Sequence, residues 1–459
     1  MMNEKEVIES FSALGQGHLF DCWTDWDEEK KSILLEELAS LDLRLLSSMQ
    51  KCLLEKQVQP SLSPIPYLSH DDIIKMEKER GQGRELISGG KAAFLTVSGG
   101  QGSRLGFKGP KGLFPISPIQ KHSLLQIFAE KVLAAEIHYG VPLFWYIMTN
   151  PANNLEIVDY FRNNSFFGLA EERVSFFSQG LNPSLSPSGK LLLNPAGTLL
   201  KNPDGHGGVI RALIKDGLLT DMVKQGIEEL FYFQVDNPLV NIPDPLFLGV
   251  HRSMGAEVSS KVISKISADE KLGSIGLLNG RAGIIEYSDL NKESRYLRDK
   301  DGNLSFSQGS IAVHLFNVAF LTRTDFVLPF HQARKKEVAL IPGSNGFILK
   351  EVEVIKFENF IFDIIPLAGK AVFYETLRAD EFAPLKNKSG VDSVETCARG
   401  YIEKYVLWLE EYGVQVPRDE EGRSIYPVEI SPLYALSKEI LKKKLSNTVN
   451  RIDEQALFI

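Results

Sequence analysis

Short apolar runs alternate with amphipathic stretches through the middle of the chain. The apolar runs predict four buried strands, at Ala92–Val97, Val141–Met148, Arg173–Phe177 and Glu229–Val235. Ser123 can cap a helix between the first two strands, with an inner stripe formed by Leu124, Phe128, Val132 and Ala135. Strands that alternate with helices predict an α/β domain with a largely parallel sheet, in which ligands sit at the carboxyl ends of the strands.

The two ends of the chain have a different pattern. Leucines and a methionine recur at three- and four-residue steps from Glu28 to Leu53, which predicts a helical segment. The proline-rich stretch Gln59–Ser69 then resists regular structure. We therefore expect a helical lobe at 1–66, a catalytic domain at 67–377 and a small C-terminal domain at 378–459. The C-terminal domain contains an amphipathic stretch at Tyr401–Leu409 and a lysine-rich helix near Lys438–Lys444.

The first predicted strand opens into a glycine-rich loop, Ser98–Gly112, which also carries Arg104 and Lys111. Glycines let the backbone approach a ligand closely, so that successive N–H groups can point at phosphate oxygens. A guanidinium and an ammonium nearby neutralise the charge of a polyphosphate. The loop is therefore predicted to hold a nucleoside triphosphate. It is not a P-loop, because no Gly-Lys-Ser/Thr closes it, and it lacks the third glycine of the dinucleotide fingerprint.

The fourth predicted strand ends in Asp236-Asn237-Pro238. A carboxylate at the end of a buried strand, beside a nucleotide pocket, is well placed to hold Mg²⁺ through oxygen ligands. Because Mg²⁺ keeps several waters and also binds phosphate oxygens, one protein carboxylate is sufficient. Asp236 is the predicted metal ligand, with Mg²⁺ as the cofactor.

Composition and charge narrow the function classes. The chain has 459 residues, a net charge of −8, 43% hydrophobic and 24% charged residues, which is ordinary for a globular protein. The acidic balance argues against nucleic-acid or membrane-surface partners. The sequence has no apolar run of about 18 residues, as a membrane span would need, and no signal-peptide pattern. The three cysteines are far apart and suggest neither a metal cluster nor a disulfide framework. We expect a cytoplasmic protein, and no pattern indicates its oligomeric state.

The segment Gly99–Gly106, followed by Pro110-Lys111-Gly112, resembles the uridylyltransferase motif of the UDP-sugar pyrophosphorylases. It is most similar to that of the UDP-N-acetylhexosamine pyrophosphorylases. Further segments match in the same order between about Gly15 and Lys386: Phe177–Gly180, Pro203–Gly208, Val235–Asn237, Lys271–Ser274, Gly283–Ser288, Gly309–His314 and Arg378–Asn387. The resemblance implies a Rossmann-like nucleotidyltransferase sheet of the GT-A type and a reaction in which UTP and a sugar 1-phosphate give a UDP-sugar and pyrophosphate.

The resemblance also implies roles for individual residues. Contacts to UTP are expected from Gly99, Gly100, Gly102, Gln179 and Gly205, and contacts to the sugar from His206, Gly273, Glu286, Ser310, Phe360 and Phe362. Gln179 has a chemical reason for its role, because a primary amide matches the donors and acceptors of a pyrimidine edge. Asn359–Ile364 alternates with period two, which is also typical of a half-buried strand.

The expected chemistry requires positioning and charge neutralisation. An oxygen of the sugar phosphate attacks the α-phosphorus in line, and it is already ionised at neutral pH, so no general base is required. Arg104 and Lys111 would hold the triphosphate and the leaving pyrophosphate, and Lys386 the incoming sugar phosphate. His314 is expected to be structural.

Two alternatives remain at this point. We expect N-acetylglucosamine 1-phosphate as the sugar, but His206 stands where the N-acetylhexosamine enzymes usually carry asparagine, which favours glucose 1-phosphate. Ser310 and Val313 also replace asparagines of the family pattern. A catalytically silent nucleotide-sugar-binding regulator is the alternative from another class. The joint presence of Arg104, Lys111, Asp236 and Lys386 argues against it.

Overall fold

The computed structural model describes residues 3–21, 23, 26–55, 60–323, 326–343, 346–445 and 449–459. The chain divides into two compact units, and each unit is built from three separate segments. Unit 1 comprises Met1–Gln59, Gln179–Arg211 and Val327–Asp363, and unit 2 comprises Pro60–Ser178, Ala212–Phe326 and Ile364–Ile459. The three-domain division expected from the sequence stays a prediction.

Four parallel strands form the centre of unit 2. They lie in the order β7 (Glu229–Gln234), β2 (Ala92–Val97), β3 (Phe144–Thr149) and β4 (Val174–Ser178). The predicted strand at Ala92–Val97 has the same bounds in the structure, and the other three differ from prediction by one to three residues at an end. Each strand is mostly buried, as expected for the centre of a sheet covered on both faces. The predicted α/β class is confirmed.

Six further strands complete this sheet among the described residues of unit 2. They are β1 (Leu62–Ser63), β8 (Val258–Ser264), β9 (Ser274–Leu278), β10 (Arg281–Ile285), β11 (Gln308–Asn317) and β14 (Ala371–Glu375). Strand β11 runs antiparallel to both β7 and β8, so the sheet is mixed on this side. The register of β11 shifts between Ser310 and His314, next to Ala312 with a positive φ of 56°.

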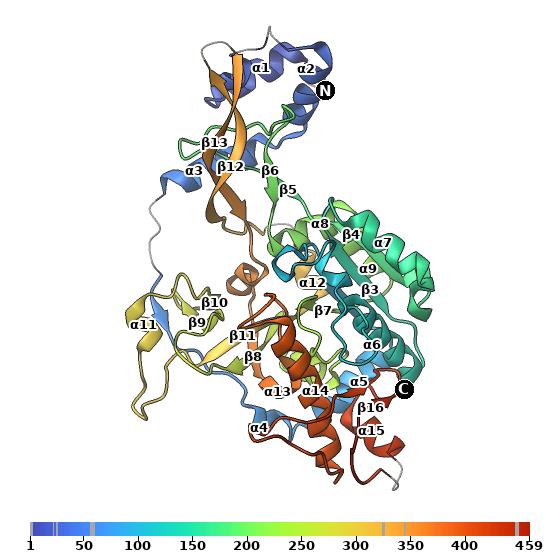
Figure 1. Ribbon diagram of the computed structural model, residues 1–459. Coiled ribbons are helices and arrows are strands. Elements are labelled where there is room, and N and C mark those ends of the chain that lie inside the picture. Colours follow the sequence, from blue (N-terminus) through green and yellow to red (C-terminus); the bar gives the residue numbers. More distant parts are fainter. Residues whose placement is uncertain are drawn as a thin grey trace. The chain divides into compact units, whose positions relative to one another are not determined.

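Helices surround the sheet in unit 2 (Figure 1). The predicted helix after Ser123 is α6 (Leu124–Tyr139), and the Ser123 side chain caps it by accepting a hydrogen bond from the Gln126 N–H. The others are α4 (His70–Ile73), α5 (Glu77–Ser88), α7 (Asn154–Asn163), α9 (Leu218–Lys224), α10 (Pro245–Ser253), α11 (Lys292–Tyr296), α12 (Val318–Leu321), α13 (Arg378–Glu381), α14 (Val394–Glu411) and α15 (Lys438–Lys444). Helix α14 contains the predicted amphipathic stretch, and α15 has the predicted bounds.

Short elements fill the connections. The 3₁₀ helices are η3 (Ser103–Leu105), η4 (Lys111–Leu113), η5 (Ser165–Gly168), η6 (Glu171–Arg173) and η8 (Ile361–Leu367). Near the C-terminus β15 (Val428–Ile430) pairs in parallel with β16 (Ala456–Phe458). Helix α8 (Val209–Lys215) directly follows the 3₁₀ helix η7 (His206–Gly208). The alternation at Asn359–Ile364, which is also typical of a half-buried strand, does not form one in the structure, because Ile361 and the residues after it form the 3₁₀ helix η8.

Unit 1 packs short helices against a long hairpin, β12 (His331–Gly343) and β13 (Gly346–Glu358) (Figure 1). Its other elements are α1 (Glu4–Ala13), η1 (Gly17–Phe20), α2 (Glu28–Ser40), α3 (Leu43–Leu54), β5 (Leu181–Pro183), β6 (Lys201–Pro203) and η7 (His206–Gly208). Their shared core includes Leu34, Leu38, Leu46 and Met49 from α2 and α3.

The predicted helical segment Glu28–Leu53 is two helices in the structure. Leu41 is extended, with φ −77° and ψ 128°, and the carboxylate of Asp42 accepts a hydrogen bond from the Arg44 N–H and caps α3. Because the N-cap residue interrupts the helix, the three- and four-residue spacing of apolar positions does not continue from α2 into α3. Within α3, Leu46 is buried, and Leu45, which continues the spacing of α2, is only partly buried.

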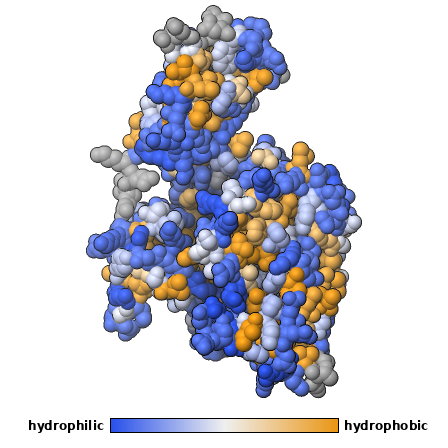
Figure 2. Space-filling model, in the orientation of Figure 1, coloured by the Kyte–Doolittle hydropathy of each residue, from blue (hydrophilic) through white to orange (hydrophobic). Residues whose placement is uncertain are grey.

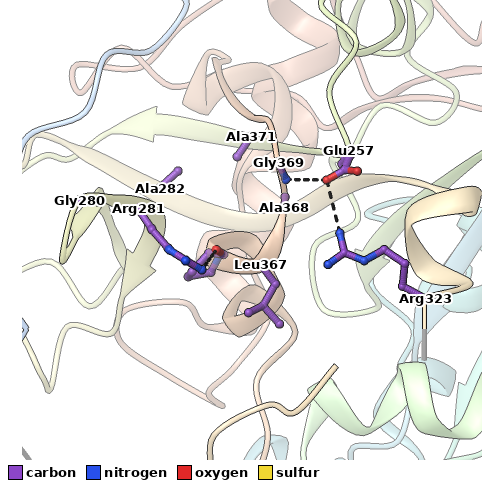
Figure 3. A pocket seen from close by; sticks show the side chains of 10 residues that line it. Glu257, Gly280, Arg281, Ala282, Arg323, Leu367, Ala368, Gly369 and Ala371 are labelled. Carbon is purple, nitrogen blue, oxygen red and sulfur yellow. Dashed lines mark hydrogen bonds and ion pairs between the residues drawn. The ribbon is translucent and has the colours of Figure 1, made fainter. Parts of the chain in front are cut away.

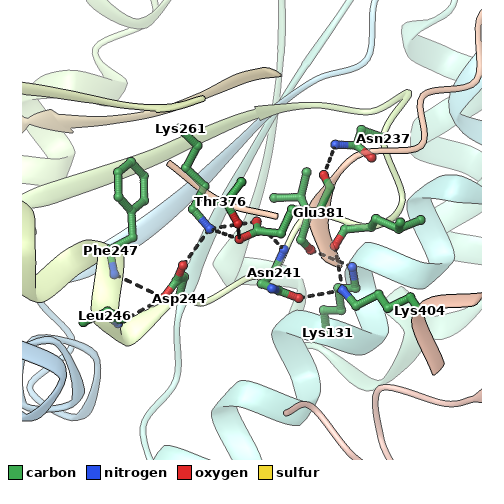
Figure 4. A network of polar contacts seen from close by, with 12 residues as sticks. Lys131, Asn237, Asn241, Asp244, Leu246, Phe247, Lys261, Thr376, Glu381 and Lys404 are labelled. Atoms are coloured by element: carbon green, nitrogen blue, oxygen red, sulfur yellow. Dashed lines mark hydrogen bonds and ion pairs between the residues drawn. The ribbon is translucent and has the colours of Figure 1, made fainter. Parts of the chain in front are cut away.

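A buried ionic network lies below the carboxyl end of β7 in unit 2 (Figure 4). The Lys261 ammonium is fully buried and donates to Asp244 Oδ2 at 2.6 Å and to Glu381 Oε2 at 2.7 Å. Burial disfavours the charged form, but the two carboxylates outweigh it and raise the pKa of Lys261. Asp244 also caps α10, and Glu381 ends α13, so this one ammonium ties two helix ends to strand β8.

Polar and apolar residues share the face of the molecule shown in Figure 2, where the apolar residues occur as patches among hydrophilic ones. Within the described ranges, no helix has the length and hydrophobicity needed to cross a bilayer.

We predict that Lys261→Met lowers the free energy of unfolding by about 3–5 kcal/mol, because it leaves the carboxylates of Asp244 and Glu381 buried without their counter-ion. Urea or thermal unfolding measures the change. The control is Lys224→Met, whose ion pair with Asp221 has side chains 69% and 57% exposed and should contribute less than about 1 kcal/mol. Equal effects of the two substitutions would contradict the role given to the network.

Candidate functional site

The glycine-rich loop leaves β2 and folds back on itself in unit 2. The Gly102 N–H donates to Gly109 O at 2.9 Å, and the Lys111 N–H donates to Gly100 O at 2.9 Å. A Cβ at Gly112 would lie 2.6 Å from Ser98 Oγ, so only glycine allows the end of the loop to close onto its beginning. Lys111 is thereby brought next to Gly100, with its Cε 3.9 Å from where a Cβ on that glycine would be.

The loop residues predicted to contact the phosphates differ in how far they are buried. Gly102 is buried, Gly99 is partly buried and Gly100 is exposed. Arg104 lies in η3 and is exposed. The Lys388 side chain approaches the loop at Gly106, with its Cδ 3.7 Å from the position of a Cβ there. The sequence had given Lys388 no role.

Asp236 and the glycine-rich loop lie at the same edge of the sheet. Strands β2 and β7 pair in parallel with Val97 opposite Gln234, and the Val235 N–H donates to Val97 O at 3.1 Å. The segments that follow β2 and β7 therefore leave the sheet next to each other. The Lys111 ammonium is 3.7 Å from Asp236 Oδ2, and the two side chains are 20% and 15% exposed.

Lys386 is the third predicted charge that the fold brings to this edge. The Leu385 N–H donates to Asp236 O at 2.8 Å, which fixes the backbone next to Lys386 against the metal candidate. The Lys386 ammonium lies 3.8 Å from Asp392 Oδ2, and its backbone N–H donates to Asp392 O at 2.7 Å. Lys111, Asp236 and Lys386 thus belong to one connected cluster within unit 2.

Asp392 is a member of this cluster that sequence reasoning missed. Burial raises its pKa, the neighbouring Lys386 opposes that shift, and the Asp236 carboxylate adds to it. Asp392 has a positive φ of 55°, which an aspartate tolerates better than most residues do. Its position in the sequence, six residues after Lys386, does not predict the ion pair, because that pair depends on the turn between the two residues.

The cluster can hold a phosphate-bound divalent cation. It contains two ion pairs, Lys111 with Asp236 and Lys386 with Asp392, so anionic oxygens and a cation both find partners. Among the described residues, no group of three or more histidines, cysteines, aspartates and glutamates is placed to hold a metal ion by itself. The donor set therefore fits Mg²⁺ only if phosphate oxygens and water complete its coordination.

Three predicted sugar contacts also come together in unit 2. The Ser310 N–H donates to Gly273 O at 2.8 Å, and Glu286 Oε1 lies 4.0 Å from the position of a Cβ on Gly273. Gly273 precedes β9, Glu286 follows β10 and Ser310 lies in β11, so the pairing of these three strands assembles the group. His314, expected to be structural, is buried on β11, and its Nδ1 is 2.8 Å from Ser260 Oγ.

The remaining predicted contacts lie in unit 1, around the buried carboxylate of Asp204. Gly180, which follows Gln179, is so close that a Cβ there would be 2.5 Å from Asp204 Oδ2. Gly205 has φ +82°, and a Cβ on it would be 2.5 Å from Asn359 O, so both its conformation and its surroundings require glycine. The Asn359 N–H donates to Asp204 O at 2.8 Å. Gln179 itself is 8% exposed.

Asp204 holds this part of unit 1 together at an electrostatic cost. Burial raises its pKa to about 6, although Arg211 lies 3.4 Å away and favours the charged form. Arg211 Nη2 also donates to Asn359 Oδ1 at 2.7 Å. Asp204 is the carboxylate of the Pro203–Gly208 motif, so the sequence contained the residue but gave it no role.

The predicted sugar-side rings are in contact within unit 1. The rings of His206 and Phe360 stack, with centroids 5.1 Å apart and an interplanar angle of 7°, and Phe362 lies 5.9 Å from His206. The Ile361 N–H donates to His206 Nδ1 at 3.1 Å. The predicted set therefore divides into a phosphate and sugar group in unit 2 and a uridine and sugar group in unit 1.

Two cavities in unit 2 are lined by other residues. One, of about 530 Å³, lies where Glu257 accepts a hydrogen bond from the Gly369 N–H at 2.6 Å and faces Arg323 (Figure 3). The other, of about 520 Å³, borders Asp244 and Glu381 of the ionic network. Neither cavity is lined by a predicted site residue.

The fold is that of the UDP-sugar pyrophosphorylases. A crystal structure of the uridine diphosphate N-acetylglucosamine pyrophosphorylase from Trypanosoma brucei in complex with inhibitor matches with a TM-score of 0.81 and 26% identity, covering 100% of this chain and 99% of that one. A UDP-glucose pyrophosphorylase from Leishmania major, at 14% identity and a TM-score of 0.63 over 94% of each chain, shares the fold.

The chain belongs to the UDPGP family, described as UTP–glucose-1-phosphate uridylyltransferase, whose model matches residues 43–398. It is 33% identical over 436 residues to UDP-N-acetylglucosamine pyrophosphorylase of Saccharomyces cerevisiae, which covers 88% of this chain and 91% of the relative. It is 32% identical over 467 residues to UDP-N-acetylglucosamine diphosphorylase 1 of Arabidopsis thaliana, covering 95% and 90%. The resemblance stated from the sequence motifs is confirmed.

We predict a pH-dependent stability difference for Asp204→Asn. Because the pKa of Asp204 is raised in the folded state, the carboxyl contributes stability at low pH that is lost as the pH rises toward 6. Between pH 5 and pH 8 the variant should gain about 1.4 kcal/mol relative to the wild type. Chemical denaturation of both proteins at the two pH values measures this. A constant difference across that range would show that Asp204 ionises normally.

Proposed function

We propose that this protein is a uridylyltransferase that forms UDP-N-acetylglucosamine and pyrophosphate from UTP and N-acetylglucosamine 1-phosphate. The observation that carries the proposal is the cluster of Lys111, Asp236 and Lys386 at the carboxyl ends of β2 and β7. Relatives that bear the name UDP-N-acetylglucosamine pyrophosphorylase, or diphosphorylase, align over nearly the whole chain. They support the choice of sugar.

The cluster supplies what the transfer needs. The attacking oxygen of the sugar phosphate is ionised at neutral pH, so the protein must bring two anions together and stabilise the charge that develops on the phosphates. Lys111 lies in the loop that would cradle the triphosphate, and Lys386 follows Leu385, whose N–H donates to Asp236 O. Cations held in place before the substrates bind act on the transition state without reorganisation. Arg104, exposed on the same loop, is the second cation expected to contact the triphosphate.

Asp236 is the residue that would hold Mg²⁺, with Asp392 as a second carboxylate in the cluster. When bound, Mg²⁺ would neutralise part of the negative charge of the phosphates. The Lys111 ammonium, 3.7 Å from Asp236, balances the carboxylate before the metal and nucleotide arrive.

Each unit contains candidate contacts to the sugar. Glu286 offers a carboxylate acceptor for sugar hydroxyls, and Phe360 and Phe362 offer apolar surface for an acetamido methyl group. Glucose 1-phosphate is the second candidate, favoured by His206 in place of asparagine and by the description of the family. A silent regulator would need no ordered pair of cations around a carboxylate, so the cluster argues against that alternative.

We predict that Lys111→Ala lowers kcat/KM for UTP by about 100-fold or more, because it removes a charge aimed at the phosphates. The free energy of unfolding should change by no more than about 1 kcal/mol. A coupled pyrophosphate-release assay and thermal unfolding measure the two quantities. Lys108→Ala, an exposed lysine of the same loop, is the matched control and should stay close to the wild type. Near-normal turnover of Lys111→Ala would refute the assignment.

We predict that the wild-type protein releases pyrophosphate from UTP in the presence of N-acetylglucosamine 1-phosphate and Mg²⁺, with a higher kcat/KM than for glucose 1-phosphate. A panel of sugar 1-phosphates, with and without EDTA, measures the sugar preference and the metal requirement together. A higher kcat/KM for glucose 1-phosphate would favour the second candidate. Absence of pyrophosphate with every sugar would favour the regulator.

A further inference from the structure

Four aromatic rings form a cluster in unit 1: His206, His331, Phe360 and Phe362. His331 begins β12, far in sequence from the other three rings. It stacks on Phe360 with centroids 4.0 Å apart and an interplanar angle of 21°, which is closer than the stack of His206 on the same ring. Phe362 contacts both Phe360, at 5.3 Å, and His331, at 6.3 Å.

A carboxylate connects this ring cluster to the backbone. Asp363 Oδ2 pairs with His331 Nε2 at 2.8 Å and also accepts a hydrogen bond from the Phe360 N–H at 3.3 Å. The Asp363 N–H in turn donates to Phe360 O at 3.1 Å. Since a carboxylate only accepts, His331 Nε2 carries the proton in this pair. One aspartate therefore holds the backbone of Phe360 and, through His331, its ring.

The pair is sheltered but reachable. The side chains of His331 and Asp363 are 26% and 13% exposed, and Phe360 is partly buried, with both His206 and His331 stacked on its ring. Without His331, the Phe360 ring loses its closer stacked neighbour and keeps its contacts with His206 and Phe362, so it is held less firmly. Binding a sugar against it would then require the ring to be ordered first, at a cost in affinity.

We propose that His331 and Asp363 are positioning residues that hold Phe360 in place for the sugar of the substrate. The inference rests on the proposed function, in which Phe360 and Phe362 face the acetamido group. His331 does not act on the phosphates. It fixes the orientation of an aromatic surface that fits an apolar methyl group, and the acetamido methyl is what N-acetylglucosamine has and glucose lacks.

This role predicts a selective change in kinetics. His331→Ala should raise KM for N-acetylglucosamine 1-phosphate by about five- to tenfold, from the cost of ordering one side chain. KM for UTP should change by less than about twofold. The preference for N-acetylglucosamine 1-phosphate over glucose 1-phosphate should fall, because only the acetylated sugar uses the ring surface. Calorimetric titration of UDP-N-acetylglucosamine gives a readout independent of turnover and should show the same loss.

Two further variants separate positioning from simple stability. His331→Phe keeps a ring on Phe360 but loses the bond to Asp363, and should recover part of the affinity. Asp363→Asn keeps the size of the side chain, so it tests the carboxylate with less change in packing than His331→Ala causes. The matched control is Arg334→Ala on the same strand, whose ion pair with Glu353 has side chains 62% and 47% exposed, and which should behave as the wild type.

The outcomes distinguish this inference from the proposed function. If the wild type releases pyrophosphate but a folded His331→Ala and Asp363→Asn keep the sugar KM within twofold, the positioning role is overturned and the function stands. A uniform fall of kcat with both sugars, with KM unchanged, overturns it as well. If the wild type is inactive with every sugar phosphate and does not bind UDP-N-acetylglucosamine, both proposals fall.

Discussion

The candidate site of unit 2 depends on buried ammonium groups that hold an irregular segment of backbone. Between Asp236 and Asp244 the chain forms neither helix nor strand, and most of it is buried, so its carbonyl groups need donors. Lys131 supplies them to Pro238 O at 2.6 Å and Val240 O at 2.7 Å, and Lys404 to Leu239 O at 2.7 Å (Figure 4). One ammonium carries three donors, which makes lysine suited to this task.

This arrangement has an electrostatic cost that the neighbouring carboxylates offset in part. Burial lowers the pKa of Lys131 well below its usual value, and Lys404 adds to that shift. Burial also lowers the pKa of Lys404 to about 8, although Asp380 and Glu381 oppose the shift. The same Glu381 accepts from Lys261 and precedes the segment that carries Lys386. The network therefore fixes both Asp236 and the approach to Lys386, which keeps the cations of the cluster in place before the substrates bind.

The centre of the fold and part of the site could be predicted because their signals are local. The apolar run Ala92–Val97 defines a strand by itself, and a loop or carboxylate directly after a parallel strand must lie at the carboxyl edge of the sheet. Lys111 and Asp236 follow from that rule. Lys386 was found through a motif, and the structure gives the physical reason for its position in the bond from Leu385 to Asp236.

Other features had no local signal. Lys131 lies within the helix whose inner stripe was predicted, but a lysine there is ordinarily read as solvent-exposed, and its partners are more than 100 residues away. Asp392 depends on a turn, and the break between α2 and α3 depends on Asp42 acting as an N-cap instead of a helical residue. The contacts of Lys131 are tertiary, whereas the turn and the N-cap are local, and the periodicity of apolar residues contains none of the three.

The choice of sugar illustrates the same limit on a motif. His206 in place of asparagine was read from the sequence as favouring glucose. In the structure its Nδ1 accepts the Ile361 N–H, which the oxygen of an asparagine side chain can also do, and its ring adds a stacked surface to Phe360. The exchange therefore keeps the acceptor and enlarges the apolar wall. Whether that wall is ordered depends on His331, which β12 brings from elsewhere in the chain. Under the proposed function, sugar preference would depend on the packed ring cluster and would not be determined by a single position in the motif.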